Sequence, residues 1–298
     1  MTAIIETNNL NFYYGKHHAI HNLNLEVPES SIYGFLGPNG AGKSTTIKLL
    51  LGLLKSCEPN IFLFGKEFLV NKYEILTNVG CLIESPSLYR HLTAYESLKY
   101  LNYIYQVGED RINSVLKIVG LWDDRNKKVR QFSSGMKQRL GIGISMLHCP
   151  KLLILDEPIN GLDPKGVVET RELLLKLQNE GTTIFISSHI LSEVEKLCTH
   201  LGIINQGNLI YQGSMSKILS NSTRNVSIQT SDNNKTAEIL TSQFKIESKD
   251  QNMVKITVKS NQDFNKMIYC LTQNQIEVFN IETLTGSLED IFIDLTLN

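Results

Sequence analysis

The sequence has few features of a secreted, membrane-spanning or nucleic-acid-binding protein. Its 29 basic and 30 acidic residues give a formal net charge of −1, so the composition predicts no nucleic-acid partner. No apolar run approaches the roughly 18–20 residues that a membrane-spanning helix needs. The first residues, MTAIIETNNL, lack a basic stretch followed by a long apolar core, so we expect no signal peptide.

Cysteine is also sparse, with five residues scattered along the chain and no C-x-x-C pair. An odd, scattered set predicts reduced thiols in the cytosol, not a disulfide framework or a zinc site. No internal repeat or low-complexity linker is visible. At 298 residues the chain exceeds one typical domain and can bury a large core.

A glycine-rich segment, GPNGAGKST at residues 37–45, has the G-x-x-x-x-G-K-[ST] spacing of a phosphate-binding loop. Residues 31–36 predict the preceding strand and residues 45–54 the following helix. Glycines let successive N–H groups face one anion, and a helix N-terminus adds partial positive charge. We expect Lys43 to reach the β- and γ-phosphates of ATP and the Ser44 hydroxyl to ligate Mg²⁺. The residues expected to bind ATP here are Gly37, Pro38, Asn39, Gly40, Ala41, Gly42, Lys43, Ser44 and Thr45.

Two acids follow a second apolar run, LLIL at residues 152–155. A buried parallel strand delivers such side chains at its carboxyl end, so we expect Asp156 to hold Mg²⁺ and Glu157 to orient the attacking water. A lone acid pair often only caps a strand, but this one lies downstream of a phosphate-binding loop. His189 ends the next predicted strand, residues 182–189, and is expected to contact the γ-phosphate.

In this order the motifs resemble the nucleotide-binding subunit of ABC transporters, over essentially all of residues 3–215. The resemblance implies that Tyr14 stacks on adenine, with Tyr13 as the alternative. It implies that Glu157 and His189 are catalytic, His189 as the switch histidine. Asp163 would belong to the loop that crosses to a partner subunit.

The signature loop of this family, usually LSGGQ, would here be FSSGM at residues 132–136. Ser133 and Gly135 keep the positions expected to contact a γ-phosphate, while the third and fifth positions differ. The loop precedes a predicted helix over residues 135–146, which adds an anion site at its N-terminus. In the family this loop meets ATP bound by the opposite subunit. With one phosphate loop and one signature per chain, the resemblance implies a head-to-tail homodimer with two composite sites.

Glu84, in the segment VGCLIESPSLYRHLT at residues 79–93, stands where most family members have glutamine. A carboxylate can accept a hydrogen bond from Mg²⁺-bound water but cannot donate one, and it adds negative charge near the phosphates. We expect it at the ATP and metal site, with Ser44 and Asp156. With FSSGMKQRLGIG, Glu84 resembles a narrower group, the ATP-binding subunits of exporters for lantibiotics and bacitracin. The alternative is a tolerated substitution with no bearing on the substrate.

The predicted fold class is α/β: an ABC-type nucleotide-binding domain over 1–215 with a P-loop core sheet, an antiparallel β edge and a helical subdomain near 85–150. Thr93 and Glu96 predict a capping box, Gly120 a helix stop, and Gln206-Gly207 a hairpin turn. The aromatics of the helical subdomain are expected in the core and rim of its helices: Tyr95, Tyr100, Tyr103 and Tyr105. Residues 222–298 predict a small C-terminal ferredoxin-like α+β domain with a closing helix over residues 287–295.

The sequence therefore predicts an ATP-hydrolysing exporter subunit that uses ATP and Mg²⁺ and powers peptide-antibiotic efflux through one or two separate permease subunits. It would lie at the cytoplasmic face of a bacterial cell membrane. Alternatives are the ATPase of another ABC-2-type drug exporter or, with less support, a soluble ABC ATPase that acts on ribosomes or DNA. The 79–93 segment and the signature argue against a nutrient importer, and the presence of both Glu157 and His189 argues against a silent binding module.

Overall fold

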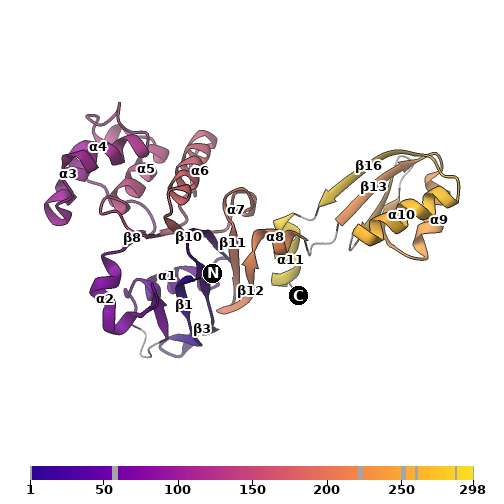
Figure 1. Ribbon diagram of the computed structural model, residues 1–298, viewed down its shortest axis with the longest axis horizontal. Helices are drawn as coiled ribbons and strands as arrows, with labels where there is room; N and C mark the ends of the chain where they lie inside the picture. Colours follow the sequence, from indigo (N-terminus) through magenta and orange to yellow (C-terminus); the bar gives the residue numbers. More distant parts are fainter. Residues whose placement is uncertain are drawn as a thin grey trace. The chain divides into compact units, whose positions relative to one another are not determined.

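The computed structural model describes residues 2–55, 60–220, 224–249, 253–258, 261–285 and 287–297. The chain divides between Ser214 and Met215 into two compact units, each described here by itself. Unit 1 is Met1–Ser214 and unit 2 is Met215–Asn298 (Figure 1).

The centre of unit 1 is a six-stranded sheet with the strand order β12-β11-β5-β10-β9-β8. Its strands are β5 (Ile32–Leu36), β8 (Val79–Leu82), β9 (Leu152–Asp156), β10 (Thr183–Ser188), β11 (His200–Asn205) and β12 (Asn208–Ser214). The pairs from β11 to β8 are parallel, and β12 returns antiparallel to β11. Every residue of β5, β9 and β10 is buried, as expected for parallel strands covered on both faces.

A second, antiparallel layer is built mostly from the first 70 residues. It contains a sheet of order β4-β1-β6-β7 and the hairpin β2-β3. The elements are β1 (Ala3–Thr7), β2 (Leu10–Tyr14), β3 (His17–Leu23), β4 (Glu26–Pro28), β6 (Ile61–Leu63), β7 (Lys66–Glu67), α1 (Lys43–Leu50) and α2 (Phe68–Leu76). A shared apolar cluster joins this layer, through Ile5 and Leu23, to α1 through Ile47 and to the central sheet through Phe35 and Phe185. The phosphate-loop helix is thereby fixed between two sheets.

The segment between β8 and β9 is helical, as predicted. It contains α3 (Ala94–Tyr105), α4 (Glu109–Ile118), the short 3₁₀ helix η1 (Val129–Gln131) and α5 (Ser134–Ser145). Thr93 and Glu96 form the expected capping box, and Gly120, at φ +63°, follows the end of α4. The two remaining helices, α6 (Pro164–Asn179) and α7 (Leu191–Leu197), follow β9 and β10.

The α3 aromatics are expected in the core and rim of the helices, and none of the four tyrosines lies in the core. Tyr95 is half-buried, whereas Tyr100, Tyr103 and Tyr105 are exposed. Buried positions of α3 are instead filled by small and aliphatic residues, Ala94, Ser97 and Leu98. Tyrosine is amphipathic, so its spacing along a helix does not by itself assign it to the core.

Unit 2 contains a four-stranded antiparallel sheet of order β14-β15-β13-β16. Its elements are α8 (Met215–Ser220), β13 (Arg224–Thr230), α9 (Asn233–Thr241), β14 (Lys245–Lys249), β15 (Val254–Val258), α10 (Asn261–Gln273), β16 (Val278–Thr285) and α11 (Leu288–Leu297). From β13 to β16 the element order is β-α-β-β-α-β, which with this strand order is the ferredoxin-like arrangement. A separate apolar core, with Ile228, Leu240, Ile256 and Met267 among its members, holds α9 and α10 to the sheet.

Candidate nucleotide site

The phosphate-binding loop forms one wall of a cavity of about 500 Å³. The cavity is lined by Pro38, Asn39, Gly40, Gly42, Lys43, Ser44, Thr45, Glu157, Asn160 and His189. Gly42 has φ +112° at the start of α1, a conformation that L side chains rarely adopt. Gly37 is required for a different reason, since a Cβ there would lie 2.3 Å from the Ile204 carbonyl oxygen. The loop therefore turns tightly against β11 and directs its backbone into the cavity.

Lys43 is almost completely buried, yet it lines the cavity. Its Nζ donates hydrogen bonds to the carbonyl oxygens of Gly37 (2.6 Å) and Pro38 (3.2 Å). Burial lowers the pKa of Lys43, and the nearby charges of Glu157 and Asp156 oppose that shift. The two acids therefore help to keep the ammonium group charged where a phosphate would bind.

Asp156 ends β9 and is nearly fully buried. The Ser44 hydroxyl donates to its Oδ2 at 3.2 Å, which joins the start of α1 to the end of β9. A hydroxyl and a carboxylate are hard oxygen ligands of the kind Mg²⁺ prefers, and Mg²⁺ takes its remaining ligands from water and substrate phosphates. The pair therefore fits the predicted metal ligation by Ser44 and Asp156.

Ser187, on β10, is a site residue that the sequence analysis missed. It lies directly opposite Asp156 in the parallel β9–β10 register and is fully buried. Its hydroxyl donates a hydrogen bond to Asp156 Oδ1 and accepts the backbone N–H of Glu157 at 2.9 Å. One serine thus fixes both acids. The sequence signal was its place two residues before His189 at the end of a buried strand.

Glu157 and His189 meet at the rim of the cavity. Glu157 Oε2 lies 2.9 Å from His189 Nδ1, and the backbone of Glu157 is left-handed, with φ +51°. A non-glycine residue in that region costs about 1 kcal/mol or more and needs support from its surroundings. The Ser187 hydrogen bond supplies such support, and Glu157 lines the cavity together with the phosphate-binding loop.

Other predicted site residues lie outside the cavity lining. Tyr13 and Tyr14 are both about half exposed on the β2–β3 hairpin, at 55% and 48%. Tyr13 stacks on His18 with ring centroids 3.9 Å apart, whereas Tyr14 packs edge-on against Phe12. Tyr13 thus has one face taken, and the assignment to Tyr14 stays a prediction.

Glu84 pairs with Lys48, one helical turn beyond Ser44 on α1, at 3.5 Å between Oε1 and Nζ. Its side chain is 73% exposed, and its backbone is left-handed at φ +60°. The role of Glu84 at the metal stays a prediction.

The signature and Asp163 lie together at the N-termini of two helices. Ser133 is the N-cap of α5, where its hydroxyl accepts the N–H of Met136. Asp163 is the N-cap of α6, where its carboxylate accepts the N–H of Gly166 at 3.3 Å. Gly135 packs against Gly166 between them. These residues form a second surface, separate from the chain's own nucleotide cavity.

Comparison with known proteins matches this geometry to a family. A family model described as ABC transporter matches residues 20–160. The bacitracin transport ATP-binding protein BcrA of Bacillus licheniformis is 42% identical over 300 aligned residues, which cover 99% of this chain and 98% of that protein. The chain belongs to the ABC transporter ATP-binding family. It therefore binds ATP, and its hydrolysis of ATP is coupled to transport.

Two further ABC proteins show how far the likeness extends. The lantibiotic transport ATP-binding protein SrtF of Streptococcus pyogenes is 45% identical over 215 residues, which cover 71% of this chain and 93% of SrtF. The solved structure of cbiO1 from Clostridium perfringens, described as part of the ABC transporter complex cbiONQ, superposes with a TM-score of 0.68 at 29% identity. It covers 73% of this chain and 91% of cbiO1. The ABC fold class predicted from the sequence is therefore confirmed.

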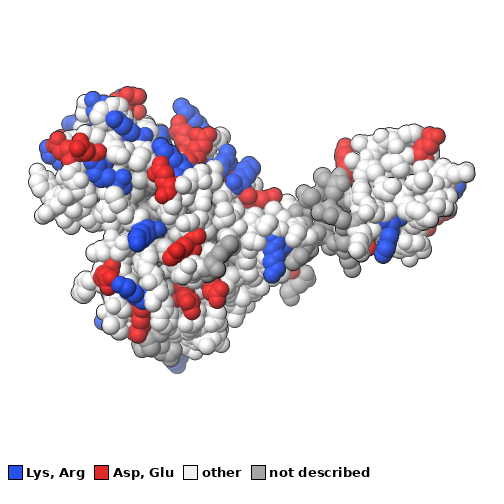
Figure 2. Space-filling model, viewed as in Figure 1, with Lys and Arg blue, Asp and Glu red and all other residues white. Residues whose placement is uncertain are grey.

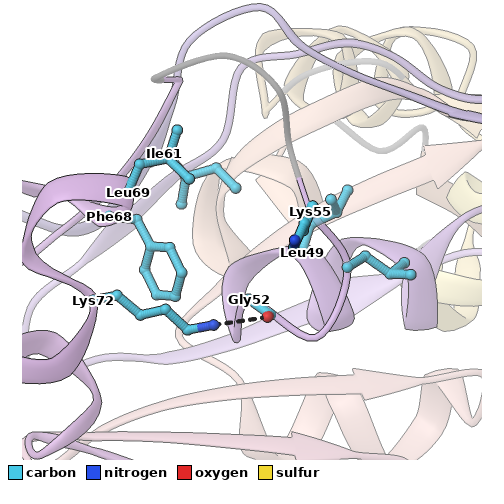
Figure 3. Close-up of a pocket in the computed structure, with 8 residues that line it drawn as sticks. Leu49, Gly52, Lys55, Ile61, Phe68, Leu69 and Lys72 are labelled. Atoms are coloured by element: carbon cyan, nitrogen blue, oxygen red, sulfur yellow. Dashed lines mark hydrogen bonds between the residues drawn. The ribbon is translucent and has the colours of Figure 1, made fainter.

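A second cavity, of about 230 Å³, lies at the other end of α1. Its walls include Leu49, Ile61, Phe68 and Leu69, and Figure 3 shows Lys72 extending past Phe68 to the Gly52 carbonyl, to which its Nζ donates at 3.0 Å. These apolar walls suit an aliphatic or aromatic group better than a phosphate. The cavity at the Lys43 end therefore remains the candidate for the nucleotide.

The visible surface of unit 1 carries charged side chains of both signs (Figure 2). On the face drawn in Figure 2, basic and acidic side chains are interspersed over unit 1. Among the residues that the structure describes, no helix is long and apolar enough to cross a membrane. Within the same residues, no group of three or more His, Cys, Asp or Glu side chains could hold a metal ion.

Proposed function

We propose that this ABC protein is the ATP-hydrolysing subunit of an exporter that removes a peptide antibiotic through a separate membrane permease. The observation that carries the proposal is the 42% identity to a bacitracin transport protein through both units of the chain. The 45% identity to a lantibiotic transport protein over 215 residues supports the same cargo class. The ATPase of another ABC-2-type drug exporter remains the second candidate, because the cargo contacts the permease rather than this chain.

In this proposal the phosphate-binding loop and the acidic residues after β9 have different roles in the nucleotide cavity. Lys43 neutralises charge on the β- and γ-phosphates, and Ser44 with Asp156 holds Mg²⁺. Bound Mg²⁺ would neutralise developing phosphate charge and orient the phosphates for in-line attack. Glu157 orients and polarises the attacking water, and His189, held at 2.9 Å from Glu157, contacts the γ-phosphate.

The separation of the signature surface from the cavity supports a homodimer. Ser133, Gly135 and Asp163 do not line the chain's own cavity, yet they present a hydroxyl, backbone N–H groups and an acid at two helix N-termini. Two copies in head-to-tail contact would place this surface against the ATP of the partner and give two composite sites. ATP affinity for the closed dimer would then drive the transport step.

We place the permease contact on α3, at the cytoplasmic face of a bacterial membrane. Tyr100, Tyr103 and Ile104 are all more than half exposed on this helix. Exposed large apolar side chains on neighbouring turns are a common feature of protein docking surfaces. A short amphipathic segment of a permease has the chemistry to cover them.

Co-purification tests the proposal directly. Tagged Glu157→Gln protein, which should keep ATP bound, would be isolated with ATP from detergent-solubilised membranes and analysed by mass spectrometry. One or two polytopic membrane proteins are expected, and Tyr103→Asp in the same background should lose them. The matched control is Tyr269→Asp, which changes a similarly exposed tyrosine in unit 2.

Cargo is tested in cells that carry the chain and its permease. The proposal expects raised resistance to bacitracin or a lantibiotic that Lys43→Ala abolishes. Resistance only to unrelated drugs would favour the second candidate. In the co-purification experiment, recovery of the tagged protein with ribosomes in the soluble fraction would overturn the proposal of export altogether.

A further inference from the structure

Arg139 on α5 connects three helices at one point. Its guanidinium forms a 3.1 Å ion pair with Glu169 on α6. The same group donates to the carbonyl oxygens of Val119 (2.9 Å) and Gly120 (3.3 Å), just beyond the end of α4. The side chain is only 12% exposed, and its Nε is buried without a hydrogen-bond partner. We call Arg139, Glu169 and these two carbonyl groups the Arg139 junction.

The junction bridges a gap between helices. A cavity of about 250 Å³ lies beside it and is lined by Gly120, by Arg139, and by Glu172 and Lys176 of α6 among others. Apolar packing is therefore incomplete between the end of α4 and α6. A guanidinium that places charge against the carbonyl end of one helix and a carboxylate on another links them across this gap.

A second contact between α5 and α6 lies one turn closer to their N-termini. A Cβ on Gly135 would lie 3.2 Å from Gly166 Cα, and a Cβ on Gly166 would lie 3.4 Å from Gly135 Cα. The Gly166 Cβ would also lie 2.8 Å from Asp163 Oδ1. The two helices therefore touch through glycines at their first turns and through Arg139 and Glu169 about one turn later. Two contact points fix both the distance and the relative orientation of two helices.

We propose that Arg139 and Glu169 are positioning residues that make the signature loop and the Asp163 loop move as one unit. Ser133 and Gly135 stand at the start of α5, and Asp163 stands at the start of α6. A displacement of α4 and α5 would be transmitted through the junction to α6 and hence to Asp163. Both loops would then reach the partner's ATP together when the dimer closes. This inference rests on the composite site proposed above.

Steady-state kinetics and measurements of dimerisation test this inference. Glu169→Gln removes the ion pair with little change of side-chain shape. Arg139→Lys keeps the positive charge but loses the planar guanidinium group that donates several hydrogen bonds at once. Each change is expected to lower kcat for ATP hydrolysis about tenfold while KM for ATP stays within about twofold, because the cavity residues are untouched. In the Glu157→Gln background each should raise the Kd of the ATP-dependent dimer about tenfold, measured by sedimentation. The double change should cost less than the sum of the two single changes, because both weaken the same Arg139–Glu169 ion pair.

Two controls lie next to the junction. Lys165→Gln removes an exposed lysine 3.8 Å from the same Glu169, and Glu172→Gln changes another acid in the same cavity. Both should leave kcat and the dimer Kd within about twofold. Gly166→Ala, which crowds Asp163, should reproduce the loss of kcat, whereas Val168→Ala on the exposed side of α6 should not.

Each remaining outcome overturns the inference in a recognisable way. If Glu169→Gln and Arg139→Lys dimerise and hydrolyse ATP like the wild type, the junction has no positioning role. If their losses of kcat are matched by Glu172→Gln and follow the thermal midpoint, the role is structural only. If the Glu157→Gln protein, with no other change, forms no ATP-dependent dimer, the composite site is refuted and the inference fails with it.

Discussion

Ser187→Ala should lower kcat for ATP hydrolysis about tenfold while leaving KM for ATP within about twofold. Ser187 is fully buried, and its hydroxyl both accepts the Glu157 N–H at 2.9 Å and donates to Asp156 Oδ1. Alanine leaves the part-buried N–H of Glu157 without its acceptor, and such a loss costs about 1–3 kcal/mol. The left-handed backbone of Glu157, which itself costs about 1 kcal/mol or more, loses its support at the same time.

The peptide of Glu157 can then relax toward an ordinary conformation and take its carboxylate away from the water position. About 1.4 kcal/mol of lost transition-state stabilisation corresponds to the tenfold fall in kcat. KM for ATP should change little, because the Lys43 contacts with Gly37 and Pro38 do not involve Ser187.

Thr183→Val provides a matched control on the same strand. Thr183 lies at the opposite end of β10, is equally buried, and its hydroxyl accepts the Ser30 N–H at 2.9 Å. Both variants should lose about 1–3 kcal/mol of unfolding free energy in urea. Only Ser187→Ala should lose kcat in steady-state hydrolysis assays. Equal kcat values for the two variants would refute the assignment of Ser187 as support for the acids.

Three other properties can be checked on the isolated chain. Burial lowers the pKa of His148. Its Nε2 donates to the Val79 carbonyl, and its Nδ1 is buried without a hydrogen-bond partner. As pH falls, the unfolded chain therefore protonates this histidine more readily than the folded chain does. Stability should therefore fall as pH drops below about 6.5, and the fall measured by urea denaturation should be shallower in His148→Gln. Gly34→Ala should cost about 1–3 kcal/mol, because its Cβ would lie 2.9 Å from Cys198 Sγ, and Cys198→Ala should restore part of that loss in the same denaturation assay. Iodoacetamide should modify exposed Cys149 but not Cys198, whose thiol pKa is raised by complete burial, as peptide mass spectrometry of the native protein would show.

The parts of the site that could be predicted are those determined by residues close together in the sequence. The phosphate loop needs its glycines, lysine and serine at fixed local spacing, so most of the cavity lining could be named before any fold was known. The same holds for the capping box of Thr93 and Glu96 and for the hairpin turn at Gln206 and Gly207. In each case the chemistry of a few neighbouring residues determines the local backbone.

The parts that escaped prediction depend on which distant elements become neighbours. Ser187 reaches Asp156 only because β10 pairs with β9 in a particular parallel register. Glu84 meets Lys48 because the segment after β8 passes the far turn of α1. Neither pairing leaves a local pattern in the sequence, because serine is common in strands and lysine is common on helices whether or not they have such a partner. Register and helix packing have to be observed.

Two relatives differ in how much of this chain they match. All residues assigned to ATP lie in unit 1, and SrtF aligns over 93% of its own length with a stretch no longer than about that unit. BcrA, by contrast, matches this chain across both units. Unit 2 has its own apolar core, as an independently packed domain does. The likeness to BcrA thus extends beyond the unit that carries the residues assigned to ATP.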